Sequence, residues 1–326
     1  MINQFRRLNP LNILFLIIVS ALLRVGFLMK IPDTLNFNFL EPFAKLLIPI
    51  PLENAFSPQV NLFIAFWLVL IQAFIFNRLI NKYNLIGKPT FLPALLYVTA
   101  SCLLKSFLIL SPTLICNFLT LWMIDRFLSI YKSDEVKSIM FDVGMIIGFG
   151  TLIYFPYIAF LPLLWITLII FTPFNWREWL CGIFGFMIVF FFLWIFYFWN
   201  DSASKFYQIW LPLTTRFPTN LEINYYDYLV LIPVIIILLI GVFQLRNNFF
   251  KSYVQVRKTF QVLFFMFLLV MVSFYLKTDF MIYHFLLAVP PASVLMSYYF
   301  LNATKRWFYE SLYILLVGFI IYFQVF

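Results

Sequence analysis

Long apolar runs, separated by short charged connectors, take up most of this 326-residue chain. A helix needs roughly 20 mostly apolar residues to cross a hydrocarbon core of about 30 Å, because each residue adds only about 1.5 Å. Hydrophobic residues make up 64% of the sequence and charged residues 11%, and the connectors are too short to hold a soluble domain. We therefore expect residues 1–326 to form a single integral membrane domain.

Charged and Pro- or Asn-rich breaks divide the chain into about eleven predicted spans, which makes the expected fold an all-α polytopic transmembrane bundle. The spans lie near residues 11–29, 60–78, 91–104, 112–131, 138–153, 157–172, 179–199, 228–245, 260–276, 280–301 and 307–325. A count of ten or twelve stays open, since the third run is short and only Tyr154-Phe155-Pro156 separates the fifth from the sixth.

The distribution of Lys and Arg predicts that the N-terminus is cytoplasmic, because basic loops are retained on that side of a membrane. With this orientation, fifteen basic residues are cytoplasmic: Arg6, Arg7, Arg78, Lys82, Lys88, Arg126, Lys132, Lys137, Arg177, Arg246, Lys251, Arg257, Lys258, Lys305 and Arg306. Six are on the outer side: Lys30, Lys45, Lys105, Lys205, Arg216 and Lys277. The basic loops also account for the net charge of +9, so we expect no nucleic-acid partner.

Two longer connectors, near residues 30–59 and 200–227, fall on the predicted outer face, and a site is most easily built there. Asp33 and Glu41 lie in the first of them. A carboxylate at a lipid boundary can act as a general base, since the less polar surroundings raise its pKa toward a useful value. The competing interpretation of both residues is a solvated loop acid.

Basic residues near the same face could hold an anionic substrate. Arg24, within the first span, could bind a lipid-linked phosphate in bidentate fashion or extend to the headgroups. Lys205 and Arg216 in the second connector present the same choice between phosphate binding and solvation.

His284 is the only histidine, and it enters the tenth predicted span shortly before Pro290 and Pro291. It could orient a phosphate or shuttle a proton, or it could be a neutral packing residue. The two prolines remove backbone donors, so they predict a kink or an unwound turn.

The remaining polar residues indicate structure rather than chemistry. Asp142 is expected to pair with Arg126 or Lys137 at the cytoplasmic boundary. The three cysteines lie within apolar runs, without metal-ligand or redox spacing, and we predict no metal site and no cofactor. Phosphate-binding glycine loops and nucleophile elbows are absent from the sequence.

Two segments carry a resemblance to a known group of enzymes. The Gly-rich stretch from Ile139 to Pro156, followed by Phe160-Leu-Pro-Leu-Leu-Trp165, resembles the middle helices of polytopic glycosyltransferases of the GT-C superfold. The segment from Tyr283 to Leu295, with its Pro-Pro-Ala sequence, resembles a late helix of those enzymes. The resemblance implies transfer of a sugar from a polyprenyl-phosphate donor to an acceptor at the outer face. It implies Asp33 as the catalytic base, with Arg24, Lys205 or Arg216 holding the donor phosphate and His284 in support.

The whole chain also resembles an uncharacterised multi-pass inner-membrane family of Bacteroidota, including Asn9-Pro-Leu-Asn12 and the connector from Arg78 to Lys88. This resemblance implies a bacterial inner-membrane location, with membrane lipids as partners, whereas a polyprenyl-phosphate lipid as partner is implied by the GT-C resemblance. The alternative to an enzyme is a non-catalytic subunit or scaffold of an envelope assembly concerned with secretion, lipoprotein handling or motility, bound to other inner-membrane proteins. Fold-level analogy alone does not decide between them.

Overall fold

The computed structural model describes residues 1–29, 31, 57–131, 133–214, 227–248, 252–276 and 281–325. Within these ranges all regular structure is helical, which confirms the all-α fold. The α-helices are α1 (Ile2–Phe5), α2 (Leu11–Leu22), α3 (Val25–Met29), α4 (Pro58–Lys82), α5 (Leu92–Ala100), α6 (Pro112–Ser129), α7 (Val136–Ile153), α8 (Leu161–Phe171), α9 (Trp176–Trp199), α10 (Leu231–Asn248), α11 (Val254–Val272), α12 (Val289–Asn302) and α13 (Arg306–Val325). Short 3-10 helices join several of them: η1 (Lys105–Phe107), η2 (Phe155–Phe160), η3 (Ala203–Thr214), η4 (Asp227–Val230), η6 (Ser273–Leu276) and η7 (Ile282–Ala288).

Every one of the eleven predicted apolar runs contains helix, but not all of that helix is long enough to cross a membrane. In the described part of the chain, seven helices are long and apolar enough: Pro58–Lys82, Val136–Ile153, Trp176–Trp199, Tyr228–Asn248, Val254–Leu276, Ile282–Asn302 and Arg306–Val325. Leu11–Leu22 and Phe155–Phe171 are shorter apolar helices. The length and hydropathy of these helices indicate a membrane protein, while the count of eleven spans stays a prediction.

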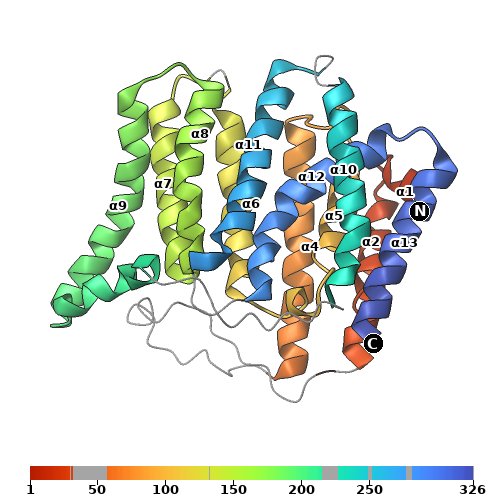
Figure 1. Ribbon diagram of the computed structural model, residues 1–326, viewed down its shortest axis with the longest axis horizontal. Helices are drawn as coiled ribbons and strands as arrows, with labels where there is room; N and C mark the ends of the chain where they lie inside the picture. Colours follow the sequence, from red (N-terminus) through yellow and green to blue (C-terminus); the bar gives the residue numbers. More distant parts are fainter. Residues whose placement is uncertain are drawn as a thin grey trace.

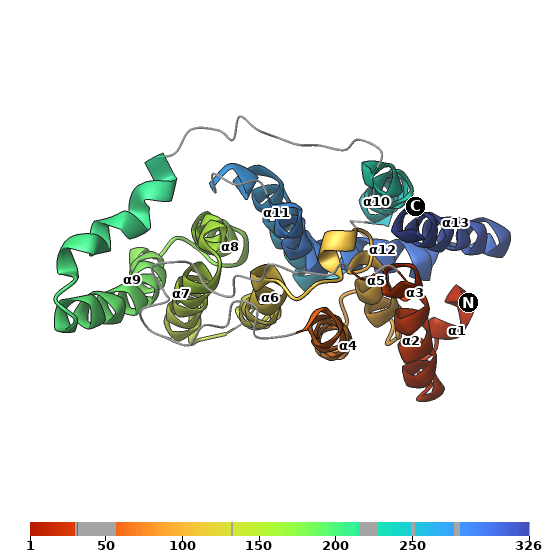
Figure 2. The same cartoon turned by 90° about the horizontal axis from the view of Figure 1, so that it is seen from below.

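The helices stand side by side in a flattened bundle (Figure 1). Seen along the helices, α12 and α5 lie between a row formed by α2, α4, α6 and α7 and a second group formed by α10, α11 and α13 (Figure 2). In the Ile282–Asn302 helix, 89% of the apolar stretch is buried, which makes it the interior element around which the others pack. Helix α9 lies at one end of the long axis and α13 at the other (Figure 1).

Glycines allow α7 and α9 to pack with their backbones in contact. A Cβ atom added to Gly144 would lie 2.1 Å from the carbonyl oxygen of Gly182, and one added to Gly185 would lie 2.1 Å from that of Phe141. Small residues at such positions let membrane helices approach closely, and the gain comes from van der Waals packing. The glycines of both helices therefore make the close approach of α7 and α9 possible.

Three irregular segments lie within the protein at the end of the bundle opposite the N-terminal helix: residues 101–111, η2, and the turn that η7 forms before α12. Non-helical backbone at membrane depth needs partners from the protein. Asn61 Oδ1 accepts from the Leu110 N–H at 2.9 Å, Thr113 Oγ1 donates to the Tyr283 carbonyl at 2.9 Å, and Asn117 Nδ2 donates to the Leu286 carbonyl at 3.2 Å. Buried polar side chains thus replace the missing helical bonds.

Both breaks expected from proline are present. Pro156 lies in η2, between α7 and α8. Pro290 and Pro291 occupy the first turn of α12, after the 3-10 turn of η7. At that position the missing N–H would have had no partner in the helix anyway, so the two prolines begin the helix rather than kink it.

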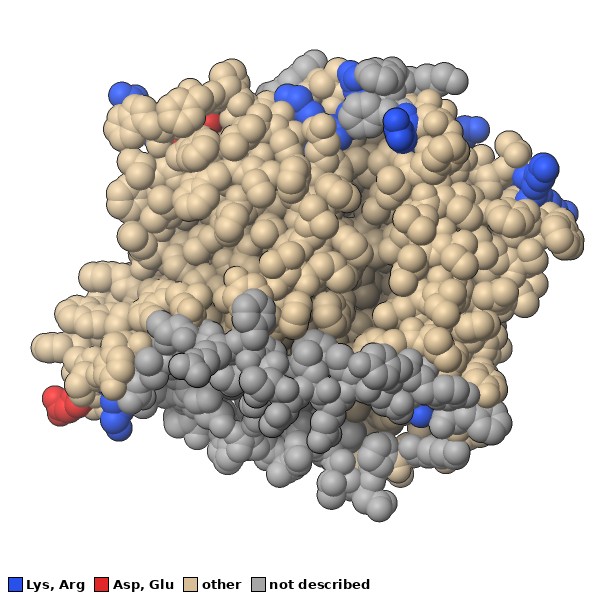
Figure 3. Space-filling model, viewed as in Figure 1, with Lys and Arg blue, Asp and Glu red and all other residues tan. Residues whose placement is uncertain are grey.

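Basic side chains gather at the opposite end of the bundle, along the upper edge of Figure 3. The charged pairs of that end include Lys82 with Asp125 at 2.8 Å and Arg126 with Asp142 at 3.3 Å, and the second of these confirms a predicted pair. Arg6 also donates to the carbonyl oxygens of Phe300 and Ala303, which fastens the N-terminal segment to the end of α12. The separation of charge expected from the sequence is therefore present in the described residues.

Candidate functional site

An apolar groove with a volume of about 510 Å³ lies between α10 and α11. The surface is hollowed at this place, between the two helices (Figure 3). Its walls are apolar stripes on α10 and α11, and its floor is formed by α12 and the chain that follows α5. The lining residues are Ala100, Leu103, Leu104, Phe107, Tyr228, Leu231, Val234, Ile235, Leu238, Phe267, Met271, Phe274, Phe285, Ala288, Val289, Ala292 and Met296.

The groove follows from the helical period of three separate segments. On α10 the lining positions Leu231, Val234, Ile235 and Leu238 recur at intervals of three and four, as one face of a helix requires. At the floor, Ala288 at the end of η7 and Ala292 in α12 leave room where larger side chains would fill the space. Three helix faces that would otherwise pack together thus surround an open volume.

The groove runs through about half of a membrane. Its lining on the α10 side extends over the eleven residues from Tyr228 to Leu238, which span about 15 Å at 1.5 Å per residue. A hydrocarbon core is about 30 Å thick. The groove therefore opens near the end of the bundle that carries few charges and stops near its middle.

Arg24 does not line this groove; it contacts the chain that follows α5, which forms part of the floor. The side chain is 3% exposed, at the junction of α2 and α3, and its Nη1 donates to the Leu108 carbonyl at 3.4 Å. The guanidinium carbon is 5.6 Å from the centre of the Phe66 ring. Within the described residues, Nε and Nη2 have no hydrogen-bond partner. A buried cation with so few partners is costly, which marks this position for function or for an anion.

His284 joins three helix ends through both of its ring nitrogens. Nε2 is 3.0 Å from the Val270 carbonyl oxygen and 3.2 Å from Ser273 Oγ, and Nδ1 is 3.1 Å from the Tyr154 hydroxyl. Since a carbonyl oxygen can only accept, Nε2 carries the hydrogen, and Nδ1 accepts from Tyr154. The geometry is that of a neutral, fully bonded imidazole between α7, α11 and η7.

The other predicted site residues do not come together with these two in the described structure. Lys205 is exposed on η3, which packs beside α9. Asp33, Glu41 and Arg216 lie outside the described residues. Arg24 and His284 bind different stretches of backbone, so the structure leaves the proposed catalytic constellation as a prediction.

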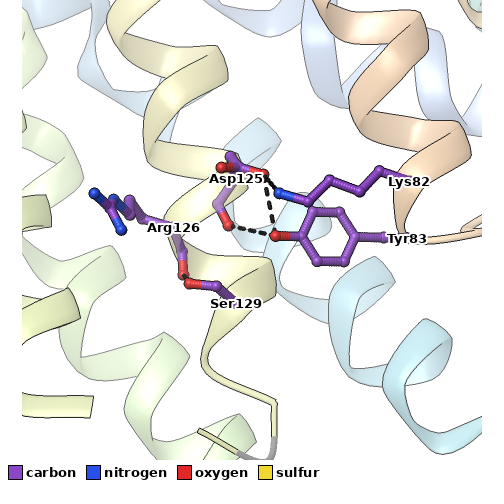
Figure 4. A network of polar contacts seen from close by, with 5 residues as sticks. All are labelled: Lys82, Tyr83, Asp125, Arg126 and Ser129. Atoms are coloured by element: carbon purple, nitrogen blue, oxygen red, sulfur yellow. Dashed lines mark hydrogen bonds and ion pairs between the residues drawn. The ribbon is translucent and has the colours of Figure 1, made fainter. Parts of the chain in front are cut away.

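A second polar cluster lies at the basic end of the bundle (Figure 4). The Tyr83 hydroxyl donates to Asp125 Oδ1 at 3.0 Å, and Lys82 Nζ binds the same oxygen at 2.8 Å. Burial raises the pKa of the Tyr83 hydroxyl, which keeps it protonated and able to donate. Each charge in the cluster already has a partner, so the cluster ties α4 to α6 and offers no open site. Across the ranges that the structure describes, no three His, Cys, Asp or Glu side chains are grouped so that they could hold a metal ion.

The groove was missed by the sequence analysis. The helix faces that line the groove are apolar, and the helix faces that contact lipid are apolar too. Hydropathy therefore does not distinguish a groove-lining face from a lipid-facing one. The one available signal was the pair Ala288 and Ala292, small residues four positions apart and therefore on one face of a helix.

Comparison with known proteins gives a family but no activity. A family model described as "Family of unknown function (DUF6427)" matches residues 37–326. No curated protein and no solved structure matches the chain.

Proposed function

We propose that this chain, which belongs to the DUF6427 family of unknown function, is a membrane protein that binds a lipid by its hydrocarbon tail in the groove between α10 and α11. The observation that carries the proposal is the groove itself: about 510 Å³, lined by apolar side chains and open at the surface of the bundle. Ligand sites are typically concave, mostly apolar and few in a protein.

The surroundings of the groove support a lipid rather than a water-soluble ligand. Its walls belong to helices of membrane length, and exposed apolar side chains such as Ile232, Leu239 and Phe264 continue outward from both walls. A ligand would therefore enter from the hydrocarbon phase. Moving a chain from lipid into an apolar groove gains little from the hydrophobic effect, because both surroundings are apolar, so selectivity has to come from packing and from the headgroup.

Filling the groove tests the proposal. Replacing Ala292 on its floor with Trp is expected to reduce the lipid that co-purifies in mild detergent by at least about tenfold, equivalent to about 1.4 kcal/mol, because the indole occupies the space of the tail. The measurement is mass spectrometry of lipids bound per protein. Leu238→Trp, at the inner end of the groove, is expected to act in the same direction.

The matched control is Ala21→Trp, since Ala21 is exposed on α2 and lies outside the groove. The control is expected to retain its lipid, and thermal unfolding of all three variants separates loss of the ligand from loss of the fold. Equal lipid occupancy in Ala292→Trp and the wild type, with both folded, would mean that the groove is not the binding site.

If the bound lipid is a substrate, the protein would be a glycosyltransferase of GT-C type. The groove would hold the tail of a polyprenyl-phosphate-linked sugar, and Asp33 and Glu41 would serve the reaction at the outer face of a bacterial inner membrane. The N-terminus would then be cytoplasmic, as the basic end of the bundle supports.

Asp33→Ala is expected to make the lipid-linked sugar accumulate on the purified protein, as measured by mass spectrometry. Unchanged levels of that lipid in the variant count against catalysis.

One surface favours the alternative, a subunit of an envelope assembly. Helix α9 presents large apolar side chains away from the bundle, among them Phe184, Phe191, Phe192 and Phe198. It packs on α7 through its glycine face and lies at one end of the bundle (Figure 2). Such a face suits a partner helix in the membrane. A stoichiometric protein partner lost on Phe191→Ala and Phe192→Ala would support this role.

A further inference from the structure

We propose that the ligand of the groove is a single-chain lipid phosphate whose headgroup is bound by Lys105, an inference that rests on the lipid-binding function proposed above. Lys105 is the first residue of η1, the turn whose neighbouring residues Leu104 and Phe107 line the groove. Two of the basic residues considered from the sequence are described elsewhere in the structure: Arg24 contacts the carbonyl oxygen of Leu108, and Lys205 is on η3 beside α9.

Lys105 lies between two residues that line the groove, Leu104 and Phe107. The Phe107 N–H donates to the Leu104 carbonyl oxygen, which closes a tight turn around Lys105. Lys105 is half-buried, and within the described residues it has no acidic partner. A flexible four-carbon stem allows its charge to reach a headgroup beside the turn.

The depth of the groove sets which end receives the headgroup. Its inner end, at Leu238 and Met296, lies near the middle of the helices, where a charged group would be expensive. Its other end, at Leu103 to Phe107, lies at the edge of the bundle. A tail that fills the groove therefore places its polar end beside Lys105.

A second cation strengthens the positive potential there. Arg24 donates to the carbonyl oxygen of Leu108, and the Leu108 N–H donates to the carbonyl oxygen of Lys105, so the guanidinium and the ammonium belong to the same turn. Arg24 is buried, and two of its nitrogens have no partner among the described residues. A buried charge is poorly screened and acts over a longer distance than an exposed one. Two cations on one turn favour an anionic headgroup.

The size of the groove indicates one chain rather than two. It is a single stripe between two helices, about 15 Å deep on the α10 side, and it stops within one leaflet. A lipid with one chain ending in phosphate matches such a groove, whereas a phospholipid with two chains would leave one of them outside.

The inference is tested by native mass spectrometry of the purified full-length chain in neutral detergent. Four probes are used: farnesyl phosphate, farnesol, phosphatidic acid and inorganic phosphate. The wild type is expected to bind farnesyl phosphate about tenfold more tightly than farnesol, because a hydrogen bond to a charged group adds strongly to binding. Lys105→Gln is expected to remove this preference and to leave farnesol binding unchanged, while Lys105→Arg retains it. Lys205→Gln, at the same end of the bundle, is the matched control and is expected to keep the wild-type preference.

Each alternative result has a distinct meaning. If farnesol and farnesyl phosphate bind equally to the wild type, or if Lys105→Gln keeps the preference, the headgroup assignment is wrong and the lipid-binding function stands. If phosphatidic acid binds as tightly as farnesyl phosphate, the single-chain assignment is wrong. If no lipid probe binds, or if Ala292→Trp leaves all binding unchanged, the proposed function itself fails.

Discussion

Replacing Gly185 with Leu is expected to destabilise the protein by at least about 3 kcal/mol, the upper part of the range for overpacked interiors. The added Cβ would lie 2.1 Å from the carbonyl oxygen of Phe141 in α7, and backbone cannot rotate away as a side chain can. The two helices must separate, and α9 then loses the packing on which its position depends. The measurement is the thermal unfolding temperature of the detergent-solubilised protein, with Gly144→Leu expected to act similarly.

Gly318 provides the matched control for this pair. It lies in α13, is exposed, and a Cβ added to it would meet no atom within 4 Å. Gly318→Leu is therefore expected to leave the unfolding temperature unchanged or to raise it slightly, because Leu has the higher helix propensity. Equal losses of stability at Gly185 and Gly318 would show that close contact between α7 and α9 does not stabilise the fold.

Replacing His284 with Phe is expected to cost about 2 kcal/mol, because the variant keeps an aromatic ring but loses the bonds to Val270, Ser273 and Tyr154. These bonds join the ends of α7 and α11 to η7, at a depth where water is a poor substitute. The free energy of unfolding in detergent, from reversible denaturation, measures the loss.

A double-mutant cycle with Tyr154→Phe separates the structural role from a catalytic one. If His284 Nδ1 accepts from the Tyr154 hydroxyl, the two substitutions together are expected to cost about 1 kcal/mol less than the sum of the single losses. Additive losses contradict the bond. A catalytic His284, in contrast, predicts a variant that folds with normal stability and loses only activity.

Much of the fold could be predicted from the sequence because lipid restricts the backbone to helices and closed barrels. Each apolar run contains helix, and Pro156, Pro290 and Pro291 mark helix starts or breaks, since proline lacks the N–H that a helix interior needs. Helix lengths were harder to predict. The run at 91–104 is a helix only over Leu92–Ala100, because the next residues are buried against polar side chains such as Asn61 and Arg24 that stabilise irregular backbone.

The candidate site could not be predicted to the same extent. Its lining comes from residues 100–107, 228–238, 267–274 and 285–296, which only the tertiary fold brings together. The ionisable residues that the sequence singled out were chosen because charge is expensive in a membrane, and that argument correctly marked Arg24 and His284 as unusual. It could not say that Arg24 contacts a carbonyl oxygen of the chain that follows α5, or that both nitrogens of His284 are already bonded.

Helix α5 has a consequence for how the chain enters a membrane. Its nine residues rise about 14 Å, less than half of a hydrocarbon core, and all of them are buried by neighbouring helices in the finished fold. Alone in a bilayer, such a segment would leave the ends of its backbone without partners. The burial of α5 depends above all on α4 and α12, the helices that pack against it. Because α12 comes late in the chain, α5 can be fully covered only after most of the chain has been synthesised.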